Sequence, residues 1–265
     1  MKIKLSPEFT FQLFALLIAI IVVHALYVGV IRPNADVQLQ QQMAMQAAGE
    51  DFVPERSLAV VIRDFEQEAC FILLLWALAI MAYKGRSTLR EQALLERALL
   101  DIPDGTTLLP EDAREYSRSL EALPAAEQDY LLPRTLLSAL QRFATTGSIP
   151  AVSNTIKEEC EVESDRLDSE LSMVRYIAWA IPSIGFIGTV RGIGDALGQA
   201  YKAVEGDISG VTVSLGVAFN STFVALVLSI IIMFCLHQLQ QSQEKLVLDS
   251  QRYADKRLLR HLVAH

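Results

Sequence analysis

The stretch Ala178–Ala196, AWAIPSIGFIGTVRGIGDA, decides the fold of this chain. Small residues and one proline recur in it at steps of three and four, which places them along one stripe of a helix: Ala178, Pro182, Gly185, Thr189, Gly192 and Ala196. A stripe without bulk lets another backbone come close. Because lipid cannot satisfy a hydroxyl, we expect Thr189 to bond to its own helix, to another helix or to a hydrated path.

The stretch Val211–His237 repeats this arrangement. Its small and hydroxyl-bearing residues share one side of a helix: Ser214, Ala218, Ser221, Thr222, Ala225 and Ser229. Its bulky residues share another side: Phe219, Phe223, Leu226, Ile230 and Phe234. The two stretches together predict neighbouring helices that turn hydroxyls inward and bulk outward.

Composition and hydropathy indicate a membrane protein. Of 265 residues, 52% are hydrophobic, and the mean hydropathy is +0.31. Phe11–Ile31 is long enough to cross a hydrocarbon core of about 30 Å, as are Leu171–Leu197 and Val211–His237. Ala69–Tyr83 has only fifteen uncharged residues and would also fit a buried core helix, but the charged residues that flank it can snorkel, which favours a crossing.

We therefore predict an all-α membrane protein with four transmembrane helices, a helical cytoplasmic domain between the second and third, and a C-terminal cytoplasmic helix. The predicted parts are the N-terminus with the first transmembrane helix (1–31), a periplasmic loop (32–68), the second transmembrane helix (69–84), the cytoplasmic domain (85–170), a pair of transmembrane helices (171–237) and the C-terminal helix (238–265). That last helix is amphipathic, and would pack on the cytoplasmic domain or against a copy of itself.

The positive charges predict the orientation. Lys2 and Lys4 precede the first span, and further basic residues follow the second and fourth, so both termini are predicted to be cytoplasmic. A signal peptide is the alternative for the first span, but the apolar run is too long and no cleavage site follows it promptly. The net charge of −8 argues against a nucleic-acid partner.

No pattern of catalytic, cofactor or metal-binding residues is present, so we expect neither an enzyme nor a metal site. Cys70, Cys160 and Cys235 have no metal-ligand spacing and are assigned to packing. His24 would form an interhelical or packing contact, with a proton relay as the alternative, and Asn220 would clamp neighbouring helices or subunits rather than line a pathway.

A helix is predicted to begin near Ser153 and to continue into the third span. Its acidic residues are interpreted as one solvated face, with a cation site as the alternative: Glu158, Glu159, Glu161, Glu163, Asp165, Asp168 and Glu170. Its packing contacts are predicted to come from Ile156, Val162, Leu167 and Leu171.

The residues Pro182–Ile193, PSIGFIGTVRGI, resemble the signature P-x-φ-G-φ-φ-G-T-V-x-G-φ of the MotA/TolQ/ExbB family of ion-driven membrane motors, where φ is a hydrophobic residue. Ala218–Leu226 resembles the next span of that family, with a threonine among alanines. The resemblance covers about Leu171–Leu239. The layout is more similar to MotA, whereas the motif is more similar to ExbB and TolQ.

The resemblance implies a ring of subunits, five in that family, around a single-span partner similar to ExbD, TolR or MotB. That partner supplies a membrane aspartate, and Thr189, Thr222 and Ser221 would line the ion pathway beside it. The helix-packing and pore-lining positions would be Pro182, Gly185, Gly188, Gly192, Ala218 and Ala225. No cofactor is implied beyond the transported ion.

Three positions depart from the family pattern. Val217 stands where ExbB and TolQ carry a glutamate, so the chain is expected to lack a carboxylate of its own at the depth of the threonines and to conduct poorly without a partner. Arg191 would pair with Asp195, either as a structural pair or as an ion entrance. Ser221 adds a hydroxyl, which keeps sodium open as an alternative to protons.

The predicted function is therefore a ring-forming subunit of a membrane motor driven by an ion-motive force, which conducts protons, or sodium, with its single-span partner and converts the flow into mechanical work. The alternative is a non-conducting oligomeric scaffold or signalling subunit in the lipid bilayer.

Overall fold

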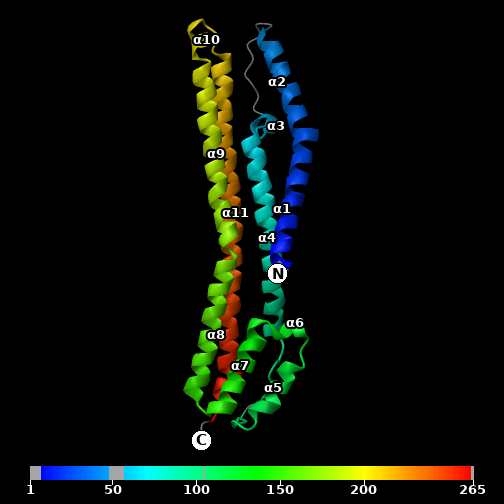
Figure 1. Cartoon of the computed structure of the whole chain (residues 1–265), viewed down its shortest axis with the longest axis vertical. Helices are drawn as coiled ribbons and strands as arrows, with labels where there is room; N and C mark the ends of the chain where they lie inside the picture. Colours follow the sequence, from blue (N-terminus) through cyan, green and yellow to red (C-terminus); the bar gives the residue numbers. More distant parts are fainter. Residues whose placement is uncertain (1–6, 48–56, 104, 264–265) are drawn as a thin grey trace, which may run out of the picture. The chain divides into compact units, whose positions relative to one another are not determined.

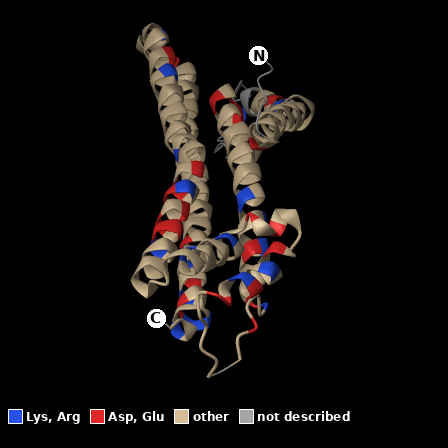
Figure 2. Ribbon diagram, turned by 60° about the horizontal axis from the view of Figure 1, so that its bottom comes forward, with Lys and Arg blue, Asp and Glu red and all other residues tan. Residues whose placement is uncertain are grey.

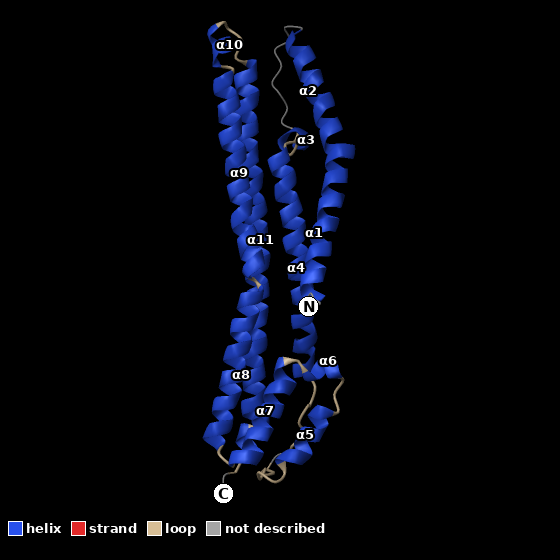
Figure 3. Ribbon diagram, viewed as in Figure 1, coloured by secondary structure: helices blue, strands red, loops and turns tan. Residues whose placement is uncertain are grey.

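The computed structural model describes residues 7–47, 57–103 and 105–263, and every element named in this part of the chain is a helix (Figures 1 and 3). Lys2 and Lys4 lie outside the described residues. The chain divides into two compact units, which are described separately. The first comprises the described residues of Met1–Met81 and Met173–Leu236, and the second those of Ala82–Ser172 and His237–His265.

Four helices are long and apolar enough to cross a membrane, which confirms the four predicted crossings. The first continues from α1 (Pro7–Leu26) through a π-helical turn, η1 (Tyr27–Ile31), into α2 (Arg32–Ala47). The others are α4 (Phe65–Leu95), α9 (Ser172–Gly198), which follows α8 (Ile149–Glu170), and α11 (Ser209–Arg257). The short α10 (Ala200–Val204) lies between α9 and α11. The described chain is a multi-pass membrane protein.

The segment between the first two crossings differs in detail from the prediction. It is helical over α2 rather than a loop from its first residue, and a short helix, α3 (Leu58–Val61), precedes the second span. The helix is interrupted at residues 62–64. The helix α4 then begins with its own cap, since the backbone N–H of Asp64 donates to Gln67 Oε1 at 2.7 Å.

The helices α1 and α4 pack antiparallel through contacts spread along their length. Trp76 Nε1 donates to the carbonyl of Gln12 at 2.9 Å, and His24 Nδ1 lies 2.7 Å from Glu68 Oε1. An apolar cluster packs around the second of these contacts: Val23, Tyr27, Ile31, Ile62, Phe71 and Ile72. The short second span is therefore joined to the first by hydrogen bonds as well as by apolar contact.

The second unit has a core of bulky side chains. Basic and acidic residues recur along its helices, as Figure 2 shows. This unit contains α5 (Ala113–Glu121), α6 (Ala125–Gln128), α7 (Leu131–Thr146), α8, the ends of α4 and α11, and η2 (Leu259–His261). Phe143, Leu136 and Leu140 of α7 are completely buried. The end of α11 contributes Val247, Ala254 and Leu258 to this core, so the amphipathic C-terminal helix packs on its own chain.

The prediction of a fully solvated acidic face on α8 is wrong at Glu163. This carboxylate is only 1% exposed and accepts hydrogen bonds from Arg134 Nη2 at 2.9 Å and from Arg166 Nη2 at 2.5 Å. Burial raises the pKa of Glu163, but these guanidinium donors outweigh it and hold the pKa below its ordinary value. The inward face of α8 passes through Ile156, Cys160, Glu163 and Leu167, so Val162 points outward instead.

Candidate functional site

The small-residue stripes of α9 and α11 face each other within the one chain, where the two helices lie side by side (Figure 1). A Cβ added at Gly185 would lie 2.4 Å from Ala225 Cβ, and one at Gly192 would lie 2.8 Å from Ala218 Cβ. Neither position accepts a larger residue without moving a backbone. Gly194 and Gly198, also on α9, make no such contact, because a Cβ at either position would meet nothing within 4 Å.

Pro182 leaves a gap in the hydrogen bonds of α9, and α11 fills it. Proline has no backbone N–H, so the carbonyl of Ala178 loses its usual helical donor. Ser229 of α11 donates its hydroxyl to that carbonyl at 3.2 Å. One hydroxyl of the predicted stripe is therefore used to join the two helices.

We call the contact between the small-residue stripes of α9 and α11 the seam. Thr189 and Thr222 meet in its middle. Their hydroxyls hydrogen-bond to each other, and Thr189 Oγ1 also lies 3.0 Å from the carbonyl of Ala218. Thr222 Oγ1 lies 3.2 Å from the carbonyl of Gly185. Both threonines are half-buried, so each keeps part of its surface exposed. Their role in an ion pathway stays a prediction.

The threonine pair has two ways to arrange its protons. Each hydroxyl carries a single proton, so one proton joins the two oxygens and the other goes to a carbonyl. When Thr189 donates to Thr222, Thr222 donates to Gly185; when the direction reverses, Thr189 donates to Ala218. The direction of the hydrogen bond between the two hydroxyls can therefore reverse.

Ser221 lies beside the pair and is buried, with 1% of its surface exposed. Its hydroxyl oxygen has no hydrogen-bond partner among the described residues. It faces Gly188, where an added Cβ would lie 2.7 Å from Ser221 Oγ. The extra hydroxyl that the sequence suggested is therefore directed at α9, next to Thr189.

Arg191 has a partner that the sequence did not reveal. Its predicted partner Asp195 is 4.0 Å away, whereas its Nε and Nη2 donate to the two carboxylate oxygens of Glu66 at 2.7 Å and 2.8 Å. Glu66 lies in the first turn of α4, and its Cγ would be 3.2 Å from a Cβ at Gly188. The expectation that the chain lacks a carboxylate at the level of the threonines is therefore wrong, because α4 supplies one.

Other charged groups gather near the start of α4. Glu68 is 5% exposed and accepts hydrogen bonds from Arg32 and His24, so His24 makes an interhelical bond. Asp64 Oδ2 and Gln67 Nε2 are buried without a hydrogen-bond partner in the described part of the chain. Burial raises the pKa of Asp64, which precedes the membrane-spanning helix.

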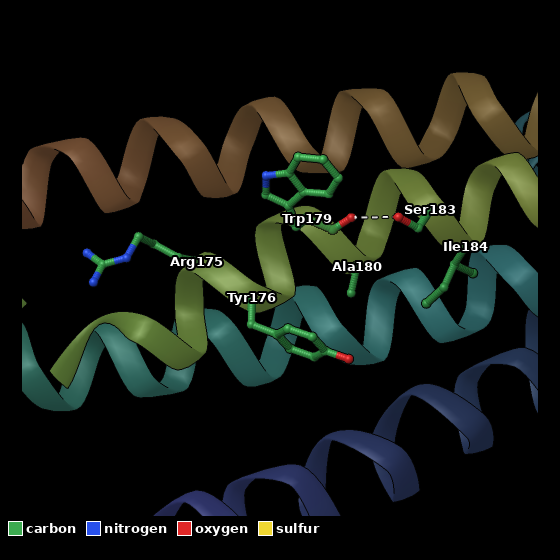
Figure 4. A pocket seen from close by; sticks show the side chains of 6 residues that line it. All are labelled: Arg175, Tyr176, Trp179, Ala180, Ser183 and Ile184. Carbon is green, nitrogen blue, oxygen red and sulfur yellow. Dashed lines mark hydrogen bonds between the residues drawn. The ribbon is translucent and has the colours of Figure 1, made fainter. Parts of the chain in front are cut away.

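A surface hollow on α9 lies away from this site (Figure 4). Six residues of α9 line it: Arg175, Tyr176, Trp179, Ala180, Ser183 and Ile184. Trp179 is 80% exposed and lies ten residues, or about 15 Å of helix, from Thr189. Exposed aromatic rings beside an arginine are typical of a membrane interface. We interpret the hollow as part of that belt rather than as a ligand site.

Four apolar helices, two of which hold hydroxyl groups between them, define a multi-pass membrane protein. Residues 127–252 match the model of the MotA/TolQ/ExbB proton channel family, which confirms the resemblance found in the motif. The match extends beyond the motif into α7, α8 and the last part of α11. No curated protein and no solved structure gave a significant match. The family is one of channel proteins and not of enzymes.

Proposed function

We propose that the chain is the ring-forming subunit of a membrane motor that conducts protons and converts their flow into mechanical work. The family match supports a channel subunit of the motor type. The observation that carries the proposal is the Thr189–Thr222 hydroxyl pair between α9 and α11, because its two proton arrangements suit a relay.

The proposed assembly is a pentamer around a single-span partner similar to ExbD, TolR or MotB, in a bacterial inner membrane with both chain termini in the cytoplasm. The partner supplies an aspartate, which reaches the exposed parts of Thr189 and Thr222. Each proton that crosses about 100 mV releases about 2.3 kcal/mol, so the driving force needs no chemistry by this chain. Protons are preferred to sodium because the relay is built from hydroxyl donors.

The alternative is a non-conducting scaffold. It is favoured by one observation, which is that both threonine hydroxyls are already satisfied within the chain. In a scaffold these bonds would only hold α9 to α11.

The test is proton flux into liposomes by the complex purified with the single-span product of a neighbouring gene. We expect Thr189→Val and Thr222→Val each to lower the initial rate by about tenfold or more, as expected for loss of a proton-transfer group. Thr212→Val is the matched control, since Thr212 is exposed and its hydroxyl donates to the carbonyl of Ile208, four residues earlier and outside the seam. Unchanged flux in both seam variants would remove the proposed pathway, and no flux in the wild-type complex would favour the scaffold.

A further inference from the structure

Glu66 is a carboxylate that the family motif does not account for, and it is placed beside the hydroxyl seam. Its side chain is 12% exposed, and its Cγ and Ser221 Oγ both lie within 3.2 Å of the point where Gly188 would carry a Cβ. The absence of a side chain at Gly188 therefore lets a residue of α4 approach α11. Gly188 and Ser221 are the chain neighbours of Thr189 and Thr222.

The hydroxyl of Ser221 is the second observation that points to a ligand here. It is buried and has no hydrogen-bond partner among the described residues, and such an unsatisfied group costs about 1–3 kcal/mol. Thr189, Thr222 and Ser229 are all satisfied by carbonyls of the seam, so Ser221 differs from the other seam hydroxyls. The O–H of a protonated Glu66 carboxyl group would supply the missing hydrogen bond to the Ser221 hydroxyl oxygen.

Arg191 has two acidic partners to choose between. It now holds both oxygens of Glu66, and Asp195, one turn further along α9, lies 4.0 Å from its Nη1. Asp64 also lies within electrostatic range of Arg191 and is itself paired with Arg63. The buried thiol of Cys70 interacts electrostatically with Glu66. A shift of the guanidinium toward Asp195 would free Glu66 without leaving Arg191 unpaired.

We propose that Glu66 is a proton-binding group that this chain itself supplies at the entrance to the seam. Ser221 then accepts a hydrogen bond from the protonated carboxyl group of Glu66. When Arg191 releases Glu66, one carboxylate oxygen of Glu66 binds a proton from a hydronium ion, which leaves as water, and the resulting carboxylic acid donates a hydrogen bond to Ser221 Oγ. No bond other than O–H is made or broken. This inference rests on the proposed function, since it assigns the entry step of the same pathway.

The experiment compares proton flux, reported by a pH-sensitive dye inside liposomes, for the wild-type complex and four variants. Glu66→Gln should lower the initial rate by about tenfold or more, and Ser221→Ala should lower it severalfold. Asp36→Asn is the control, because Asp36 is an exposed carboxylate that pairs with Arg63 at 3.7 Å, outside the seam.

The fourth variant, Glu66→Gln with Arg191→Gln, separates a proton-binding role from a structural one. It removes both charges, so no guanidinium is left unpaired, and we expect it to assemble normally and still conduct slowly. Recovery of flux in this double variant would show that Glu66 only neutralises Arg191 and would overturn the inference. Wild-type flux in Glu66→Gln or in Ser221→Ala would overturn it as well. Absence of flux in the wild-type complex would instead overturn the proposed function.

Discussion

Helices pack together through small residues in the seam between α9 and α11, but through bulky residues in the core of the second unit. In the seam, glycine, alanine and hydroxyl side chains lie inside, while Phe219 and Phe223 are exposed. In the second unit, Phe143 and Leu136 are inside, and charged residues recur along the helices. Water drives bulky apolar side chains into a core. Lipid is as apolar as these side chains, so they stay on the outside of the helices, in contact with lipid. Helices in lipid associate through close backbone packing and hydrogen bonds instead.

Buried polar groups are treated alike in the two regions. The buried Glu163 of the second unit accepts hydrogen bonds from two arginines, and Glu66 beside the seam accepts hydrogen bonds from Arg191 at both oxygens. Each region also contains buried polar atoms without a hydrogen-bond partner among the described residues: Ser221 Oγ in the seam, and Thr135 Oγ1, Gln243 Nε2 and Ser250 Oγ in the second unit. Ser221 is therefore distinguished by its position beside Glu66 and the threonine pair.

The largest expected effect comes from emptying the core of the second unit. Phe143→Ala should lower the free energy of unfolding by about 3–5 kcal/mol, because the cavity is completely enclosed. Phe223→Ala is the matched control, since that ring is 63% exposed and its loss should cost less than about 0.5 kcal/mol within the chain. Thermal unfolding in detergent, followed by circular dichroism, measures both. Equal destabilisation would contradict the contrast between the regions.

Crowding the seam should have the next largest effect. Gly185→Leu should cost about 3 kcal/mol or more, because even its Cβ would overlap Ala225 and no side chain can rotate to make room. Gly194→Leu serves as the control, since its Cβ would meet nothing within 4 Å. The yield of folded, detergent-stable protein reports the difference. A normal yield of Gly185→Leu would show that α9 and α11 do not pack through this stripe.

The smallest effect, and one that depends on pH, is expected at Glu163. Because its pKa is lowered in the folded state, this carboxylate contributes stability above its unfolded pKa of about 4.3, and the contribution is lost as the pH falls through the folded value. Glu163→Gln should therefore cost about 1–2 kcal/mol at pH 7. The gap between the variant and wild type should close below about pH 4.

The outcome to measure is the difference in unfolding temperature between the two proteins at several pH values. Glu161→Gln provides the control, because Glu161 is an exposed residue of the same helix that pairs only with Lys157 at 3.8 Å. A difference at Glu163 that is independent of pH would mean that packing, and not charge, explains its burial.

Much of the architecture could be predicted from local patterns. The lengths of the apolar runs predicted four crossings, and the steps of three and four predicted which face of α9 would accept a close neighbour. The prediction for the inward face of α8 was wrong by one residue, since it placed Val162 there instead of Glu163. Glu163 stands in a run of acidic residues, all of which were assigned to the solvated face. A helical repeat shows which residues share a face. An apolar residue on that face predicts burial by itself, whereas a buried charge is predicted only when its partners, which lie elsewhere in the sequence, are known.

The contacts of the candidate site depended on the tertiary structure. Glu66 and Arg191 are 125 residues apart, and nothing in either local sequence indicates the other. Their meeting depends on how far α4 is displaced along α9 and how each helix is rotated, which only the packing of all the helices determines. The sequence by itself determined that small residues and hydroxyls would face a neighbour, since periodicity is a local property. Only the tertiary structure decided that this neighbour is α11 of the same chain, and that a carboxylate from α4 stands beside it.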